Sequence, residues 1–208
     1  MNPFIMKLFD KQTGRQFFTT AGQDFYAMTA YLKFSMKINS TSFFGIGERV
    51  SNFRFTTGTY TLYPYNEPMP VADDGTGGKE GAGQHPLIIC QLADKTFFGI
   101  FLFNSNAQEI IFASNTDGTT SVSVLAVGGV LNLNYLIGPS FDEVIQQYQK
   151  LVGMPALLPK WVHGLMMRTA NYDTTTAITT DLNAHKAKNV KVEMVGLPLS
   201  ALVDQTNF

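Results

Sequence analysis

Residues able to do chemistry are spread thinly over this sequence of 208 residues. Two adjacent carboxylates, Asp73 and Asp74, lie in a glycine-rich segment that is typical of a solvated turn. A calcium site would need more oxygen ligands at regular spacing than this segment offers. The run Gly75-Thr-Gly-Gly-Lys79 is superficially similar to a phosphate-binding loop, but Glu80 stands where a Ser or Thr is required. Neither segment predicts a cation or nucleotide site.

The histidines and the single cysteine give no catalytic or metal-binding pattern. His85, His163 and His185 lie far apart, without the short spacing of metal ligands. We expect His85 to be a hydrogen-bonded structural histidine and His185 to lie on a solvated helix face. Cys90 ends the apolar run Leu87-Ile-Ile-Cys90 and is expected to be a small buried hydrophobe. No metal and no cofactor is predicted.

The elements that must position any site are β-strands up to about residue 136. Leu32, Phe34, Met36 and Ile38 alternate with polar residues, which predicts a strand with one face in a core. Shorter alternating runs surround Tyr60, Val122 and Leu133, whereas 86–92 and 97–103 are continuous apolar runs, as expected of strands buried on both faces. Turn signals separate these runs and favour an antiparallel sandwich. The segment 64–83 has no periodicity and is predicted to be a long loop.

After these strands, the spacing of apolar residues becomes that of a helix. Ser140 and Glu143 form a capping-box pattern, and Gly153 with Pro155 ends the predicted helix. Its wide apolar stripe predicts packing on the sandwich. After it come a predicted strand over 162–169, a helix over 175–188 and a strand over 190–195. This order implies a parallel strand pair with a right-handed crossover, which alone leaves its faces uncovered.

Composition limits the function classes. The net charge of −1 provides no basic field for nucleic acid, and no run approaches the ~18 apolar residues of a membrane span. The N-terminal residues lack the uninterrupted apolar region of a signal peptide, and the compartment is not defined by the sequence. Charged residues make up 15% of the chain, against roughly 25% in typical globular chains, and 17 residues are Phe. This composition predicts apolar surface that another segment or subunit covers.

Several segments in fixed order carry a family resemblance. They are Phe44-Gly-Ile-Gly-Glu-Arg49, Gly58-Thr-Tyr-Thr-Leu62, Gln84-His-Pro86, Phe103-Asn-Ser-Asn-Ala107, Gly153-Met-Pro-Ala-Leu157, Trp161 and Gly164. Together they resemble glycoside hydrolase family 31, the family of α-glucosidases such as maltase-glucoamylase. The resemblance implies a galactose-mutarotase-like antiparallel β-sandwich with a linking helix over 1–153. It further implies that 154–208 form the first β-α-β of a (β/α)8 barrel.

The resemblance also marks where sugar contacts are expected. Tyr63 ends the segment that matches a family Tyr-Thr-x-Trp, and Asn66 lies near the position of a sugar-binding aspartate. Tyr63 and Asn66 are therefore the implied substrate-binding residues. Pro198 falls where another sugar-binding aspartate is expected, and proline offers no side-chain acceptor. The catalytic carboxylate pair of the family follows its fourth and sixth barrel strands, so no residue here is assigned a catalytic role.

Two functions remain open. The chain is a catalytically inactive α-glucosidase-like paralogue or fragment that acts as a structural or interaction subunit. Alternatively, it is the N-terminal portion of an active retaining α-glucosidase whose carboxylates lie elsewhere. The expected partners are other protein subunits or a complementary barrel fragment, with carbohydrate if the assembly is active. A free carbohydrate-binding module fits less well, because Trp161 belongs to the barrel entry instead of a stacking platform.

Overall fold

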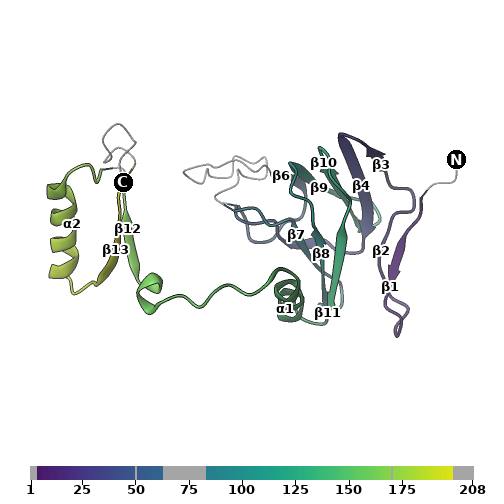
Figure 1. Cartoon of the computed structure of the whole chain (residues 1–208). Helices are drawn as coiled ribbons and strands as arrows, with labels where there is room; N and C mark the ends of the chain where they lie inside the picture. The colour runs from purple at the N-terminus through teal and green to yellow at the C-terminus, as the bar shows by residue number, and fades with distance from the viewer. Residues whose placement is uncertain (1–3, 50, 63–82, 170, 199–208) are drawn as a thin grey trace. The chain divides into compact units, whose positions relative to one another are not determined.

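The computed structural model describes residues 4–49, 51–62, 83–169 and 171–198 (Figure 1). The chain divides into two compact units, residues 1–153 and residues 154–208, which are taken separately below. Most of the predicted loop over 64–83, with Asp73, Asp74 and the run 75–79, lies outside the described residues.

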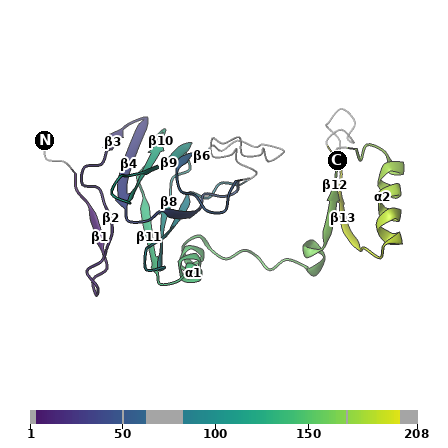
Figure 2. The same cartoon turned by 180° about the vertical axis from the view of Figure 1, so that it is seen from behind.

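The first unit is an antiparallel β-sandwich, as the sequence predicts (Figures 1 and 2). Its larger sheet has the order β1-β2-β4-β10-β9-β6, and β3 also pairs with β4. The strands of this sheet are β1 (Lys7–Phe9), β2 (Gln16–Thr19), β3 (Phe25–Met28), β4 (Tyr31–Ile38), β6 (Gly58–Leu62), β9 (Gln108–Ser114) and β10 (Thr120–Ala126). The smaller sheet has the order β11-β8-β7-β5, formed by β5 (Ser42–Gly45), β7 (Leu87–Gln91), β8 (Phe97–Leu102) and β11 (Leu133–Gly138).

The alternation of apolar and polar residues in β4 places its apolar side chains in the core, as expected. Phe34, Met36 and Ile38 of β4 are buried in the main core. Ser35 is buried as well, although its position in the alternation places it on the opposite face. Its hydroxyl forms a 2.8 Å hydrogen bond with that of Ser123 on the neighbouring β10. A paired hydroxyl avoids the penalty of burying an unsatisfied polar group.

The central strands β7 and β8 are buried on both faces, which confirms the interpretation of their continuous apolar runs. Ile88, Cys90, Phe98, Ile100 and Leu102 point into the main core between the sheets. The alternate residues of the same strands join a second cluster on the outer face of the smaller sheet, which contains Leu87, Ile89, Phe101, Leu136 and Val144.

Helix α1 (Phe141–Val152) supplies the cover for that outer face. The predicted capping box is present: Ser140 Oγ accepts from the Glu143 amide, and Glu143 Oε2 accepts from the Ser140 amide. The helix ends at Gly153, whose φ of 97° favours glycine. Val144 is fully buried and reaches the backbone of Gly99 in β8. The helix therefore approaches the sheet where the sheet has no side chain.

The second unit contains the predicted parallel strand pair, with both strands starting later than expected. It comprises the 3-10 helix η1 (Lys160–His163), β12 (Leu165–Arg168), α2 (Thr175–Ala187) and β13 (Val192–Gly196). The predicted strand start at Val162 is wrong, because the Val162 amide donates to Pro159 O and closes a turn. The start at Val190 is also wrong, since its amide donates to His185 O at the end of α2.

Burial is sparse in this second unit. Tyr172 is the only buried side chain among its described residues, and η1 and α2 contribute none. Exposed apolar side chains include Met154, Leu157, Leu158, Trp161, Leu165, Met166 and Leu197. Two strands and one helix do not enclose a core by themselves.

We expect Gly99→Ala to destabilise the first unit by about 1–3 kcal/mol, as overpacked cores do. An added Cβ would lie 2.7 Å from Val144 Cγ1 and 3.3 Å from Leu136 Cβ. Chemical denaturation of the full chain measures the loss.

The matched test is the double variant with Val144→Ala, which removes the clashing methyl group. Its loss should be smaller than the sum of the two single losses. Additive losses would show that the contact between α1 and Gly99 is not the cause.

Candidate functional site

The two residues that the resemblance assigns to substrate, Tyr63 and Asn66, lie outside the described residues. The described chain stops at Leu62, the last residue of β6, and resumes at Gly83. The candidate site is therefore defined by the groups that hold these two chain positions.

Residues 47–49, which follow β5, contact both positions through backbone and side-chain hydrogen bonds. The Glu48 amide donates to Gly83 O at 2.7 Å, and the His85 amide donates to Gly47 O at the same distance. Arg49 Nη2 donates to Thr61 O at 2.6 Å. The motif Gly-Ile-Gly-Glu-Arg thus joins β6 to the chain that enters β7. Arg49 thus bonds the backbone of a strand twelve residues further along the chain.

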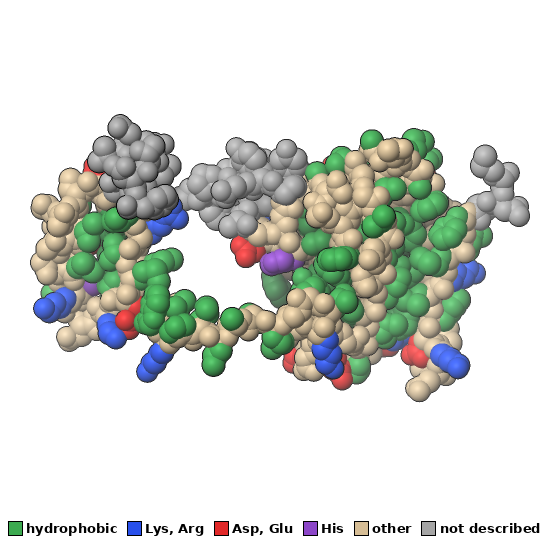
Figure 3. Space-filling view, in the orientation of Figure 1, with side chains coloured by type: hydrophobic (Ala, Val, Ile, Leu, Met, Phe, Trp, Pro, Cys, Tyr) green, Lys and Arg blue, Asp and Glu red, His purple; other side chains and the backbone are tan. Residues whose placement is uncertain are grey.

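Three polar side chains lie along these backbone contacts. The Glu48 side chain lies against Gly83, where an added Cβ would be 3.1 Å from its carboxyl carbon. The His85 imidazole lies by Gly47, at 3.5 Å from an added Cβ. The Arg49 guanidinium lies 5.5 Å from the centre of the Tyr60 ring, within cation–π range. Figure 3 shows acidic and histidine side chains next to each other on the first unit.

These groups are suited to hydrogen bonding with a polar ligand. Glu48 and His85 are exposed, so a carboxylate and an imidazole are accessible, whereas Arg49 is half-buried and its Nη2 bonds Thr61 O. His85 contributes to the structure through its backbone. Its amide donates a hydrogen bond to Gly47 O, and its carbonyl accepts one from Leu87 N. Its imidazole is exposed.

A second candidate lies in the second unit, between the carboxyl end of β12 and helix α2. A hollow of about 580 Å³ opens there beside Arg168, Thr169 and Asn171. The Arg168 side chain lies along Gly196, the last residue of β13. Pro198 follows two residues later and is half-buried. At the position where the resemblance implies an aspartate, Pro198 thus presents a side chain without a hydrogen-bond acceptor.

The polar pair that borders this hollow has no sequence signal. Tyr172 Oη donates to Asp181 Oδ2 at 2.9 Å and joins the strand–helix connection to α2. These residues are nine positions apart and follow no local periodicity, so sequence reasoning did not find them. His185 Nδ1 lies 2.8 Å from the Asp181 carbonyl and its ring is half-buried, which corrects the expectation of a solvated histidine.

The remaining reactive groups are structural. Cys90 is buried and has no disulfide partner, and burial raises the pKa of its thiol well above the ordinary value. Within the described ranges, no three His, Cys, Asp or Glu side chains gather closely enough to hold a metal ion. No helix in the described part of the chain is both long and apolar enough to cross a membrane.

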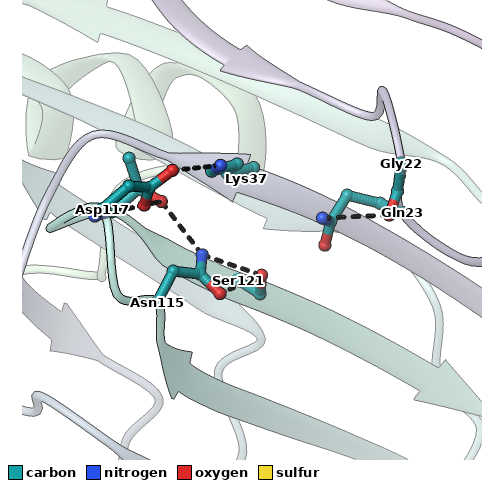
Figure 4. A network of polar contacts seen from close by, with 7 residues as sticks. Gly22, Gln23, Lys37, Asn115, Asp117 and Ser121 are labelled. Atoms are coloured by element: carbon teal, nitrogen blue, oxygen red, sulfur yellow. Dashed lines mark hydrogen bonds and ion pairs between the residues drawn. The ribbon is translucent and has the colours of Figure 1, made fainter.

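A polar network on the outer face of the larger sheet also stabilises structure (Figure 4). Asp117 pairs with Lys37 of β4 and accepts from the amide and hydroxyl of Thr119. Asn115 Nδ2 donates to the hydroxyls of Thr119 and Ser121. The contact with Lys37 holds the turn between β9 and β10 against β4, and the other contacts stabilise the turn itself.

The comparisons with known proteins agree with the fold. No family model matches the chain. Human intestinal sucrase-isomaltase is 27% identical over 208 residues, which is all of this chain and 11% of that protein. The lysosomal acid alpha-glucosidase of Tetrahymena pyriformis is 25% identical over 207 residues, 99% of this chain and 22% of that protein.

Solved structures give the same result. A Flavobacterium johnsoniae family 31 dextranase complexed with glucose aligns with a TM-score of 0.74 and 21% identity, over 93% of this chain and 23% of its own. An ER glucosidase II complex of a catalytic subunit with the binding domain of a regulatory subunit aligns with a TM-score of 0.70 and 16% identity, over 84% of this chain and 21% of its own.

The matched structures share the antiparallel β-sandwich fold of the first unit. The chain is homologous to glycoside hydrolase family 31 and spans about a tenth to a quarter of the length of the proteins it matches.

The contacts of Asp117 predict how its carboxyl group titrates. Hydrogen bonds from Lys37 and Thr119 lower the pKa of Asp117 from 3.8 to about 2. Because the folded pKa is depressed, the stability that the carboxylate contributes is present above pH 3.8 and is lost as the pH falls through about 2. We expect Lys37→Met to move the titration midpoint of Asp117 upward, measured by NMR of the side-chain carboxyl carbon.

Lys33→Met is the matched control. Lys33 lies on the same face of β4 and pairs with Asp24 instead. It should leave the Asp117 midpoint unchanged, and an equal shift in both variants would contradict the assigned cause.

Proposed function

We propose that this chain is a non-catalytic, α-glucosidase-like protein that acts as a structural or interaction subunit. The observation that carries the proposal is the sparse burial within the second unit, in which Tyr172 is the only buried side chain of the described residues. A unit so poorly buried gains stability chiefly from a partner that covers its apolar side chains.

The expected sugar contacts support a non-catalytic role. Pro198 lies just beyond β13, at the position of an implied aspartate, and offers neither a side-chain acceptor nor an N–H group. The resemblance likewise assigns Asn66 to the position of a second aspartate. Proline removes the acceptor at one position and asparagine removes the negative charge at the other, so charged hydrogen bonds to sugar hydroxyls are lost at both.

The apolar surface supports an interaction role. Leu157, Trp161 and Met166 are half to fully exposed in the second unit, and Figure 3 shows apolar side chains on the surface of both units. One solved relative is itself a complex of a catalytic subunit with part of a regulatory subunit. Protein subunits are therefore the proposed partners.

The second candidate is the N-terminal portion of an active retaining α-glucosidase. The parallel β12–α2–β13 unit favours it, because a parallel pair with a crossover helix is the repeating unit of a (β/α)8 barrel. In this case a complementary barrel fragment would cover the second unit. That fragment would supply two carboxyl groups about 5–5.5 Å apart as nucleophile and acid/base.

Co-purification of the native protein, with α-glucosidase assayed on the same fraction, separates the two candidates. We expect a complex with other polypeptides and no hydrolysis of maltose or p-nitrophenyl α-glucoside. Met166→Lys should weaken the complex, since it places a charge on the exposed apolar surface of β12. Lys188→Glu, an exposed change at the end of α2, should not.

Hydrolysis together with a tightly bound polypeptide that carries the catalytic carboxylates would refute the non-catalytic role. It would identify the chain as the front portion of a working enzyme. A complex that survives Met166→Lys and Lys188→Glu equally would refute the second unit as the interaction surface.

A further inference from the structure

The connection between β4 and β5 carries a sequence pattern that the proposed function does not use. Residues 39–41 are Asn-Ser-Thr, and no other asparagine of the sequence is followed two residues later by Ser or Thr. Asn-x-Ser/Thr, with any residue except Pro in the middle, is the acceptor pattern for N-linked glycosylation. Because so short a pattern also arises by chance, the structure around it decides whether it can be used.

The pattern lies in a surface connection, as a glycosylation acceptor must. β4 belongs to the larger sheet and ends at Ile38, and β5 belongs to the smaller sheet and begins at Ser42. Residues 39–41 therefore cross from one sheet to the other. Asn39 and Thr41 are exposed, whereas Ser40 between them is only 5% exposed. The two residues that define the pattern thus lie on the outside of the crossing.

Ser40 holds the crossing in place. Its hydroxyl donates to Gln91 O of β7 at 2.6 Å and accepts from the Ser42 amide at 3.1 Å. Its carbonyl accepts from the Thr120 hydroxyl of β10 at 2.7 Å. Since β7 and β10 belong to different sheets, the middle residue of the pattern is fixed to both sheets of the sandwich.

The side chains of Asn39 and Thr41 are not used by the fold. Among the described residues, neither side chain makes a hydrogen bond or an ion pair. Asn104 and Asn115, by contrast, donate from their side-chain amides to other groups of their own connections. The amide of Asn39 is therefore free to react, and the hydroxyl of Thr41 is free to be recognised.

We propose that Asn39 is the acceptor of an N-linked oligosaccharide. The co-substrate is an oligosaccharide joined through pyrophosphate to a membrane lipid. Asn39 Nδ2 forms a bond to the anomeric carbon of the first sugar, and the bond between that carbon and the pyrophosphate oxygen breaks. The lipid pyrophosphate leaves, and the amide nitrogen loses one proton. Because this pattern is modified in secreted proteins, the proposal also places the chain in the secretory pathway. It holds for a catalytic and for a non-catalytic chain alike.

A glycan at Asn39 would limit where protein partners bind. N-linked oligosaccharides are bulky and keep the surface around them in water. The turn between β9 and β10 lies beside the crossing, since Thr120 pairs with Ile38. We therefore expect partners to leave this end of the first unit uncovered.

The first test is made on the native protein. Peptide-N-glycosidase releases N-linked oligosaccharides and converts the acceptor asparagine to aspartate, and heavy-oxygen water labels this conversion for peptide mass mapping. We expect the peptide that contains Asn39 to carry the label. A peptide found wholly unmodified at Asn39 before treatment would overturn the proposal.

The second test assigns the glycan to the pattern. The full chain is joined behind a cleavable signal peptide and translated in the presence of endoplasmic-reticulum microsomes. We expect one glycosylated product, which Asn39→Gln and Thr41→Val should each abolish and Thr41→Ser should retain. Asn52→Gln, an exposed change outside the pattern, is the matched control and should leave the product unchanged. A parent chain without a glycan, or a glycan that persists in Asn39→Gln, contradicts the proposal.

The third test separates the acceptor from the anchor. Asn39→Gln and Thr41→Val should keep the denaturation midpoint of the parent chain, because their side chains are not used by the fold. Ser40→Ala should lower it, since it removes the hydroxyl that bonds Gln91 and Ser42. An equal loss in Asn39→Gln and Ser40→Ala would show that the Asn39 amide is part of the fold, and the proposal would fail.

Discussion

Burial of β7 and β8 on both faces is the constraint on which the rest of the first unit depends. A strand that is apolar on both faces needs a cover on each side. The larger sheet provides one through Phe34, Met36 and Ile38, and α1 provides the other through Val144. Gly99 allows this second cover to approach closely. The helix that leaves the sandwich is thus an integral layer of it.

The two units differ in how many side chains they bury within themselves. The sandwich encloses a core of more than a dozen buried side chains, whereas the second unit encloses Tyr172 alone among its described residues. Sparse burial within the second unit is the physical basis of the proposed interaction role.

Some polar groups make structural hydrogen bonds, whereas others remain exposed and accessible to a ligand. Asp117, Lys37 and Asn115 satisfy one another and hold a turn. Around Gly83 the backbone amides of Glu48 and His85 make the structural bonds, while their side chains stay exposed. The groups available to a ligand there are the Glu48 carboxylate and the His85 imidazole, which do not make these structural bonds.

The sequence by itself determined the periodic features: the alternation of β4, the doubly apolar runs of β7 and β8, the capping box of α1 and the order of the second unit. Each depends on neighbours within a few residues, where side-chain period and cap chemistry act. Only the tertiary structure decided the long-range contacts, such as Arg49 with Thr61, Tyr172 with Asp181, and Val144 with Gly99. It also set the starts of β12 and β13, which backbone hydrogen bonds to Pro159 and His185 delay. The strand order of the two sheets was likewise decided there, because pairing partners far apart in the chain leave no local pattern.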